Sequence, residues 1–153
     1  MNILLSNDHA GTELKKEVKE FLENKGYKVN NLGEDLGESV DYPDFIHPLA
    51  KEISNKNEEK GIIICGSGNG VSMVANKYEG VRAALCWNKE IASLSRQHNN
   101  ANVLSLPARF LTTEEAIEIV NSFLKTGKLC LIVTLKLFCC KLICSILLIK
   151  LIP

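Results

Sequence analysis

The sequence lacks an excess of charge of either sign. Its 153 residues carry 18 Lys and Arg against 18 Asp and Glu. A balanced chain has no net field that would attract nucleic acid or an anionic membrane surface, so we expect neither as a partner. This length most simply forms one domain with a sizeable apolar core.

The sequence also lacks the marks of export and of metal binding. The N-terminal stretch MNILLSND has neither the basic region nor the small-residue cleavage site of a signal peptide, so we expect a cytoplasmic protein. Before the C-terminal tail, no group of Cys, His and Asp has the spacing of metal ligands, and we expect no metal. Cys65 and Cys86 each end an apolar stretch without disulfide-type spacing, so we expect reduced thiols.

Short apolar stretches alternate with amphipathic ones through the first 127 residues. Strands are predicted at 2–6, 27–32, 61–65, 81–87 and 102–106. Helices are predicted at 12–26, 43–53, 70–78, 88–99 and 112–127. Asn88 can cap one helix, and Thr112 with Glu115 forms a capping box for the last. A strand followed by a helix five times over predicts a parallel sheet covered by helices on both faces.

The stretch CGSGNGV, residues 65–71, follows the third predicted strand. Its glycines let the backbone approach a ligand closely, and the helix that follows offers N–H groups to an anion. It is not a P-loop, because no Gly-Lys-Ser/Thr follows. It is a poor dinucleotide fingerprint, because Val71 replaces the third glycine and the next strand ends without an acidic residue. A nucleotide-binding redox domain is therefore disfavoured.

Cys65 stands at the start of this loop. A cysteine that ends a buried strand is most often a small core residue. A thiol beside a helix N-terminus, however, favours the thiolate form. Next to a cluster of backbone donors, a thiolate could take a proton beside a carbonyl while the donors hold the enediolate oxygen. Both interpretations stay open on this stretch alone.

Three further stretches carry polar residues with two interpretations each. In NDHAG, Asp8 can cap a helix and His9 can be a surface residue, or they can bind sugar hydroxyls and phosphate. In SRQHNN, His98 can complement a helix dipole, or act as the acid and base that opens a sugar ring. In PARF, Arg109 can be solvated or can contact phosphate.

Together these stretches resemble the type B ribose-5-phosphate isomerase family, which includes the galactose-6-phosphate isomerase subunits. The matching segments are NDHAG, SVDYPDF, GIIICGSGNGVSMVANK, GVRAAL, SRQHNNANVL and ARF. The resemblance implies a Rossmann-like three-layer α/β/α sandwich with a five-stranded parallel sheet. It also implies a homodimer, or a dimer of dimers, with active sites completed across the subunit boundary.

The activity that the resemblance implies is the interconversion of ribose 5-phosphate and ribulose 5-phosphate, without metal or cofactor, in the non-oxidative pentose phosphate pathway. Cys65 would move the proton between C2 and C1, Ser67 would steady the enediolate, and His98 would open the ring. An anion hole would come from the backbone of Gly66, Gly68, Asn69 and Gly70. Asp8, Tyr42 and Asn99 would hold sugar hydroxyls, and His9 and Arg109 the phosphate. Galactose 6-phosphate and allose 6-phosphate are alternative substrates.

The chain departs from the family near its end. Family members usually close with a helix whose arginines reach the substrate phosphate of the neighbouring subunit, whereas residues 128–153 contain neither an arginine nor an acidic residue. We expect an isomerase domain at 1–127 and an atypical apolar, Cys-rich tail at 128–153. A reading-frame shift near codon 127 is our interpretation; a membrane-associated tail and an unusual packed element are the alternatives. The missing arginines also suggest a catalytically impaired sugar-phosphate binder.

Overall fold

The computed structural model describes residues 1–55 and 60–128, which alternate between strands and helices. The strands are β1 (Asn2–Asn7), β2 (Lys28–Asn31), β3 (Lys60–Cys65), β4 (Ala83–Leu85) and β5 (Val103–Pro107). The α-helices are α1 (Thr12–Asn24), α2 (Tyr42–Asn55), α3 (Asn69–Ala75), α4 (Lys89–Asn99) and α5 (Thr113–Lys125). Two short 3₁₀ turns, η1 (His9–Gly11) and η2 (Ala108–Phe110), follow β1 and β5. The predicted order of elements is therefore confirmed.

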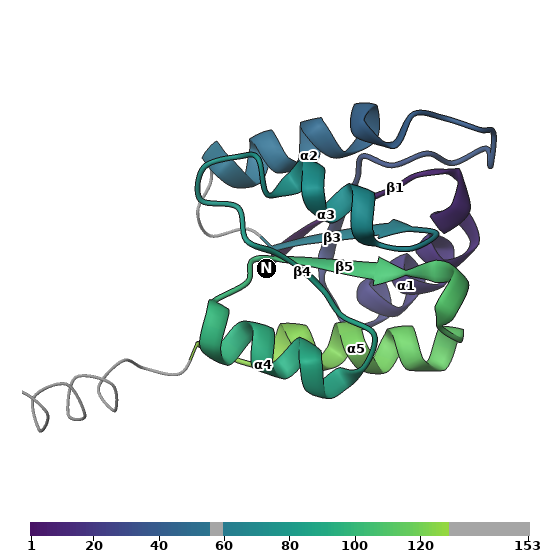
Figure 1. Cartoon of the computed structure of the whole chain (residues 1–153). Coiled ribbons are helices and arrows are strands. Elements are labelled where there is room, and N and C mark those ends of the chain that lie inside the picture. Colours follow the sequence, from purple (N-terminus) through teal and green to yellow (C-terminus); the bar gives the residue numbers. More distant parts are fainter. Residues whose placement is uncertain (56–59, 129–153) are drawn as a thin grey trace, which may run out of the picture.

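The sheet is parallel throughout and has the order β2-β1-β3-β5-β4 (Figure 1). In its centre, Asn7 at the end of β1 pairs with Ile64. Cys65 at the end of β3 pairs with Pro107 of β5. Three strands therefore end side by side, and the segments that follow them meet at one edge of the sheet.

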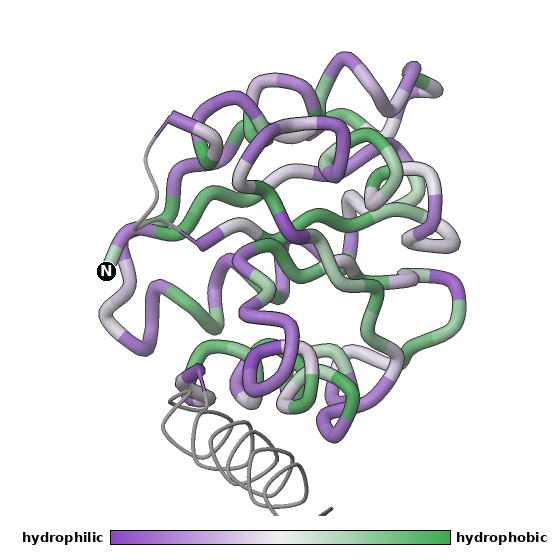
Figure 2. Tube along the Cα trace, turned by 60° about the vertical axis from the view of Figure 1, so that its left-hand side comes forward, coloured by the Kyte–Doolittle hydropathy of each residue, from purple (hydrophilic) through white to green (hydrophobic). Residues whose placement is uncertain are grey.

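Helices cover both faces of the sheet, as the sequence predicts (Figure 1). Helices α1, α4 and α5 pack with Ile62 and Ile64 of β3 in one apolar cluster. Helices α2 and α3 pack with Ile63 and Cys65 in the other. Successive side chains of a strand point to opposite faces, so the all-apolar run of β3 supplies both clusters. Figure 2 shows this central apolar layer between more polar outer segments.

Local sequence signals set most helix boundaries. The side chain of Asn88 caps α4 by accepting a hydrogen bond from the N–H of Ile91, and Thr112 and Glu115 form the predicted capping box of α5. Helix α2 includes Pro48 without ending there. Strand β4 is shorter than the predicted 81–87, and it is an edge strand that pairs with β5.

The C-terminal tail beyond residue 128, to which the frame-shift, membrane-associated and packed-element interpretations apply, lies outside the described residues. Among the helices that the structure does describe, none combines the length and the apolar character needed to cross a membrane.

Candidate active site

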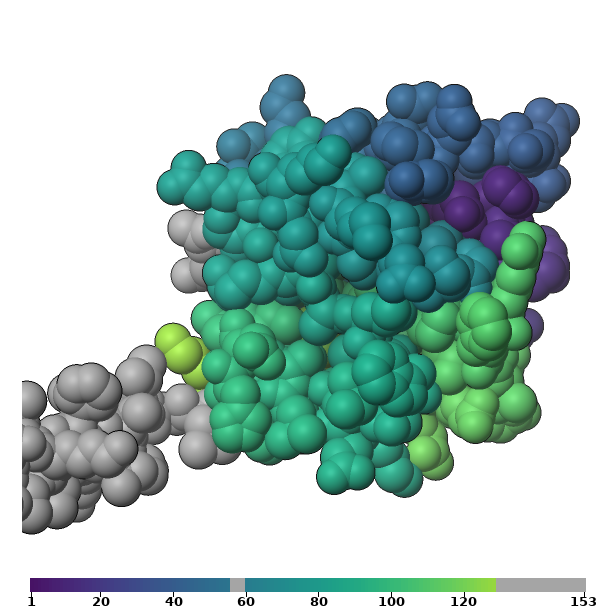
Figure 3. Space-filling view, in the orientation of Figure 1, coloured from purple at the N-terminus to yellow at the C-terminus, as the bar shows by residue number. Residues whose placement is uncertain are grey.

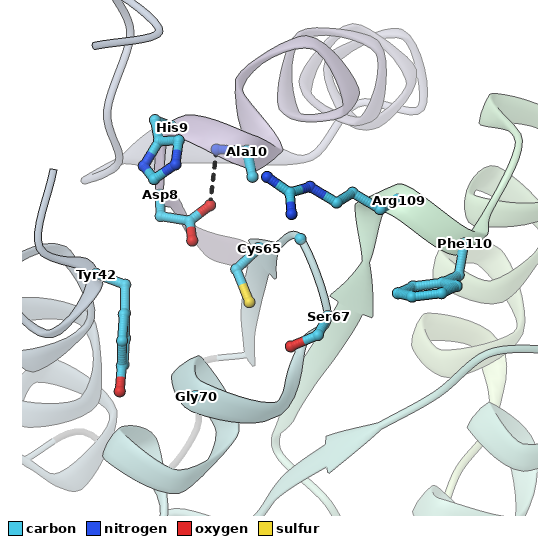
Figure 4. Close-up of a pocket in the computed structure, with 10 residues that line it drawn as sticks. Asp8, His9, Ala10, Tyr42, Cys65, Ser67, Gly70, Arg109 and Phe110 are labelled. Carbon is cyan, nitrogen blue, oxygen red and sulfur yellow. Dashed lines mark hydrogen bonds between the residues drawn. The ribbon is translucent and has the colours of Figure 1, made fainter. Parts of the chain in front are cut away.

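A cavity of about 460 Å³ opens where β1, β3 and β5 end. The purple N-terminal segment, the blue start of α2 and the green segment after β5 approach one another at this end of the molecule (Figure 3). The cavity is lined by Asp8, His9, Ala10, Tyr42, Cys65, Gly66, Ser67, Gly70, Arg109 and Phe110 (Figure 4). The sequence predicts all of these as site residues except Ala10 and Phe110, so residues far apart in the chain converge as expected.

Cys65 is the last residue of β3 and lies at the floor of the cavity. Its Sγ accepts a hydrogen bond from the N–H of Gly68 at 3.0 Å, and only 6% of the residue is exposed. Beside it, the exposed Ser67 accepts a longer bond from Asn69 N at 3.3 Å. The N–H of Gly68 thus holds the sulfur in a fixed position at the cavity floor. Cys65 is thus a buried core residue that also lines the cavity, so the two interpretations of its position in the sequence are compatible.

Cys86 is the internal comparison for this thiol. It is free, like Cys65, but fully buried in the apolar cluster of α1, α4 and α5. Burial raises the pKa of the Cys86 thiol to about 11, only partly opposed by the nearby hydroxyl of Ser95. Cys86 therefore stays protonated at neutral pH and has no access to the cavity.

The glycine loop depends on its glycines for close packing. Gly68 has a φ of 74°, and a Cβ there would lie 2.3 Å from Cδ1 of Leu85. Its carbonyl accepts hydrogen bonds from the hydroxyls of Ser72 and Ser105. Only glycine tolerates this backbone and this crowding. Gly68 thereby turns the chain sharply from β3 into α3 and holds its own N–H on Cys65.

Asp8 and His9 directly follow the neighbouring strand β1, and hydrogen bonds fix both residues. The N–H of Asp8 donates to the carbonyl of Ile64 at 3.1 Å, while its carboxylate accepts from Ala10 N at 2.9 Å and so caps η1. Nδ1 of His9 accepts a hydrogen bond from Val40 N at 3.4 Å. The capping interpretation of Asp8 is correct, and the same residue faces the cavity (Figure 4).

Arg109 and Tyr42 form opposite sides of the cavity. The N–H of Arg109 donates to the carbonyl of Gly66 at 3.1 Å, and its guanidinium extends toward Ala10 (Figure 4). Tyr42 packs on Gly70 so closely that a Cβ there would lie 2.9 Å from Cζ of the ring. Among the described residues, no carboxylate forms an ion pair with Arg109, so its positive charge is available to an anion.

His98 and Asn99 do not join this cavity within one copy of the chain. They are exposed at the end of α4, and this helix runs from the cavity edge of the sheet back to the edge where β5 begins (Figure 1). Asn100 then ends the helix with a left-handed backbone, at a φ of 48°. Gly68 and Asn69 also do not line the cavity, although both belong to the loop that forms its floor.

Two cavity residues, Ala10 and Phe110, were not predicted from the sequence. Ala10 and Phe110 stand next to predicted site residues, so the motifs NDHAG and ARF contain them. Phe110 is 74% exposed at the cavity rim. Across residues 1–55 and 60–128, the structure contains no group of three Cys, His, Asp or Glu that could hold a metal ion.

Residues 3–128 of the sequence match the model of the Ribose/Galactose Isomerase family. The chain belongs to this family. A probable ribose-5-phosphate isomerase B of Mycoplasma genitalium is 47% identical over 128 residues, which cover 82% of this chain and 84% of the relative. A D-erythrulose-4-phosphate isomerase of Pectobacterium atrosepticum is 38% identical over 125 residues, which cover 81% of this chain and 82% of the relative.

Solved structures of family members agree with this assignment. Ribose-5-phosphate isomerase B of Clostridium thermocellum superposes with a TM-score of 0.82 at 43% identity, covering 84% of this chain and 87% of the other. The Mycoplasma genitalium enzyme with bound ribulose 5-phosphate gives a TM-score of 0.81 at 45% identity, with coverage of 84% and 86%. The predicted family and the Rossmann-like fold are therefore confirmed. The family match ends at residue 128, where the atypical tail begins.

Proposed function

We propose that this isomerase interconverts ribose 5-phosphate and ribulose 5-phosphate through an enediolate, as part of the non-oxidative pentose phosphate pathway. Two observations support the substrate. The relatives include several named ribose-5-phosphate isomerase B, one of them solved with ribulose 5-phosphate bound. The cavity also combines a thiol, a cluster of backbone donors and a cationic rim, which are the groups that this reaction uses.

The phosphate would lie between His9 and Arg109. A guanidinium offers a fork of N–H donors that suits a phosphate, and charge-assisted hydrogen bonds are about twice as strong as neutral ones. With the phosphate at this rim, the sugar would extend toward Cys65. Asp8 and Tyr42 line the path and would hold its hydroxyl groups.

The reaction would move one proton between neighbouring carbons. The Cys65 thiolate takes the proton from C2, the C–H electron pair forms a C1=C2 bond, and the carbonyl pair moves to O1. The hydroxyl of Ser67 and the loop backbone from Gly66 to Gly70 stabilise this charge. The thiol then returns the proton to C1, while the O2 proton passes to O1, and the ketose results. No electrons are gained or lost overall, so the step needs no external oxidant or reductant.

A second copy of the chain would complete the site. His98 and Asn99 are exposed and lie at the opposite edge of the sheet from their own cavity. We propose a homodimer, or a dimer of dimers, in which these residues reach the cavity of the partner. There His98 would open the sugar ring, and Asn99 would hold a hydroxyl group. The reduced state of Cys65 and Cys86 suits a cytoplasmic location.

The position of Cys65 carries the proposal, because its Sγ combines access to the cavity with an N–H donor. Formation of ribulose 5-phosphate should fall by at least about 100-fold in Cys65→Ala, the loss expected for a general base. Cys86→Ala is the matched control, since Cys86 is buried away from the cavity, and it should keep the wild-type kcat. Equal rates for Cys65→Ala and wild type would disprove the role of Cys65.

An impaired sugar-phosphate binder is the second candidate. It is supported by the end of the family match at residue 128 and by the absence of arginine from the sequence beyond that point. Thermal-shift titration with ribose 5-phosphate, run beside a turnover assay, separates the two functions. Binding without turnover would favour the second candidate, whereas turnover with an ordinary KM would eliminate it. The same assay with galactose 6-phosphate, allose 6-phosphate and erythrulose 4-phosphate tests the alternative substrates.

A further inference from the structure

A buried polar cluster lies beside the cavity and includes none of its catalytic groups. Lys15 of α1 is 1% exposed, and its ammonium group donates to the carbonyl of Glu34 and, at 2.6 Å, to the carboxylate of Asp35. Glu34 and Asp35 belong to residues 32–41, the segment that connects β2 and α2. A buried cation is stable only when it is paired and hydrogen-bonded, so Lys15 holds this segment against α1.

The carboxylate of Glu34 is the second part of the cluster. It accepts hydrogen bonds from Thr12 Oγ1 at 2.9 Å, from Gly37 N at 2.7 Å and from Leu36 N. Burial raises the pKa of Glu34, but the bonds from Gly37, Thr12 and Leu36 and the charge of Lys15 more than offset this and lower it overall. Glu34 therefore stays ionised at neutral pH, and its carboxylate holds residues 34–37 in a tight turn through the N–H groups of Leu36 and Gly37.

Asn7, fully buried at the end of β1, joins the cluster to the NDHAG motif. Its Nδ2 lies within hydrogen-bond distance of the carbonyls of Asp8 and Glu34, at 2.7 and 3.0 Å, and of Thr12 Oγ1 at 3.2 Å. Gly33 packs directly on this amide, since a Cβ there would lie 2.0 Å from Oδ1 of Asn7. The two segments therefore share one set of polar contacts.

These contacts converge on His9. The hydroxyl of Thr12, besides facing Glu34, lies 3.2 Å from the carbonyl of His9. Further along the anchored segment, Val40 donates its N–H to Nδ1 of the His9 ring. A neutral imidazole that accepts at Nδ1 carries its proton on Nε2. The ring thus keeps one donor, on Nε2, for a ligand in the cavity.

We propose that Glu34 is a positioning residue for the isomerase reaction: it anchors residues 32–41 so that Val40 fixes His9 as the Nε2–H tautomer and presents a donor to the substrate phosphate. The inference rests on the proposed function for the phosphate-binding role of His9. The tautomer of His9 is independent of the proposed function, because it is a property of the free protein. Glu34 itself does not line the cavity.

Kinetics test the effect on binding. Glu34→Gln keeps the size of the side chain but removes its charge and one acceptor, and it should raise the KM for ribose 5-phosphate about tenfold while kcat stays within about twofold. Thr12→Val, which removes the hydroxyl that bonds Glu34, should also raise the KM. Thr12→Ser keeps the hydroxyl, so its KM should equal that of the wild type. The control is Glu38→Gln, an exposed carboxylate of the same segment, which should leave both constants unchanged.

The tautomer is read separately from turnover. In the ¹⁵N spectrum of the free wild-type protein, the His9 ring, assigned with a His9→Gln variant, should show the Nε2–H pattern. Glu34→Gln and Thr12→Val should shift it toward a mixture of tautomers, and Thr12→Ser should not. An unchanged His9 pattern in both disruptive variants would overturn the inference. Because this readout needs no substrate, it still decides the inference if the wild type fails to isomerise ribose 5-phosphate.

Discussion

The N–H of Gly68 points at the sulfur of Cys65 across 3.0 Å. Gly68 adopts its left-handed backbone at the first turn after β3, and that turn aims an N–H group back at the end of the strand. The sulfur of Cys65 therefore accepts from an N–H group, whereas the sulfur of Cys86, inside an apolar cluster, faces two acceptors, the carbonyl of Ala84 and the hydroxyl of Ser95. The reactivity of the two thiols should differ for this reason.

We expect selective alkylation of Cys65 over Cys86. Iodoacetamide at neutral pH should modify Cys65 first, because the pKa of the Cys86 thiol is raised to about 11 by burial. Site-resolved mass spectrometry separates these two peptides from those of the tail cysteines. Ribose 5-phosphate should slow the modification of Cys65 alone. Modification of Cys86 at the same rate as Cys65 would contradict the assignment.

Replacement of Gly68 tests the glycine loop. Gly68→Ala should destabilise the fold by about 1 kcal/mol for the left-handed backbone and by a further 1–3 kcal/mol or so for the overlap with Leu85. Gly26→Ala is the matched control, because Gly26 has a similar φ of 80° but nothing within 4 Å of its Cβ position. Denaturant unfolding measures both variants. Isomerase activity should fall in Gly68→Ala only; similar losses in both would show that crowding at Gly68 is unimportant.

Replacement of Arg109 tests the phosphate rim. Arg109→Gln removes a charge-assisted contact of about 1.5–3 kcal/mol, so KM should rise by roughly 10-fold to 100-fold. Arg109→Lys keeps the charge but loses the planar fork, and it should fall between wild type and Arg109→Gln. Steady-state kinetics at fixed ionic strength check the order. A wild-type KM in Arg109→Gln would remove Arg109 from the site.

Stability should depend on pH through Glu34. Its pKa is lowered on folding from an ordinary value of 4.5, so the unfolded chain binds more protons in the range between the two values. The contribution is therefore fully present above that ordinary value and is lost as the pH falls through the folded value. Asp35, whose pKa is lowered by hydrogen bonds from Lys15 and Asn31, adds an effect of the same sign.

Urea unfolding between about pH 7 and about pH 3 measures this dependence. The free energy of unfolding of Glu34→Gln should fall less steeply with acid than that of the wild type. Glu38→Gln, in which the exposed carboxylate is replaced, should follow the wild-type curve. A Glu34→Gln curve parallel to the wild type would exclude a depressed pKa at Glu34.

Complementation tests whether copies share active sites. Cys65→Ala and His98→Gln should each be inactive alone, yet a refolded equimolar mixture should recover about a quarter of wild-type activity, since half the dimers carry one intact site of two. Cys65→Ala mixed with Cys65→Ser gives no intact site and is the control. No recovery in the first mixture would mean that Cys65 and His98 do not act across two copies.

The sequence predicts most of the fold because its signals are local. The all-apolar β3, the cap at Asn88 and the capping box at Thr112 need only neighbouring residues, and each is confirmed. The cavity residues were predictable because parallel strands end at one edge of the sheet. The strand order, with β5 between β3 and β4, was not predicted, because no local pattern encodes which strands become neighbours.

The Glu34 cluster was not predicted for a related reason. Asn7 lies 27 positions from Glu34, and Lys15 lies 19 positions from it. Each residue alone has an ordinary interpretation: Lys15 as a helix surface charge and Glu34 as a loop residue. Only the packing of residues 32–41 against α1 makes them buried partners. Contacts between distant residues of no special type leave no local signal.

The direction of α4 has a kinetic consequence. The helix starts at Lys89, at the edge of the sheet where the strands end, and His98 lies nine residues further along, about 14 Å away at 1.5 Å per residue. If His98 acts in the cavity of another copy, Cys65 and His98 of one chain belong to different active sites, and an isolated chain has no complete active site. Specific activity should then fall on dilution, with a rate that rises as the square of enzyme concentration below the dissociation constant of the dimer, and should recover when the enzyme is concentrated again.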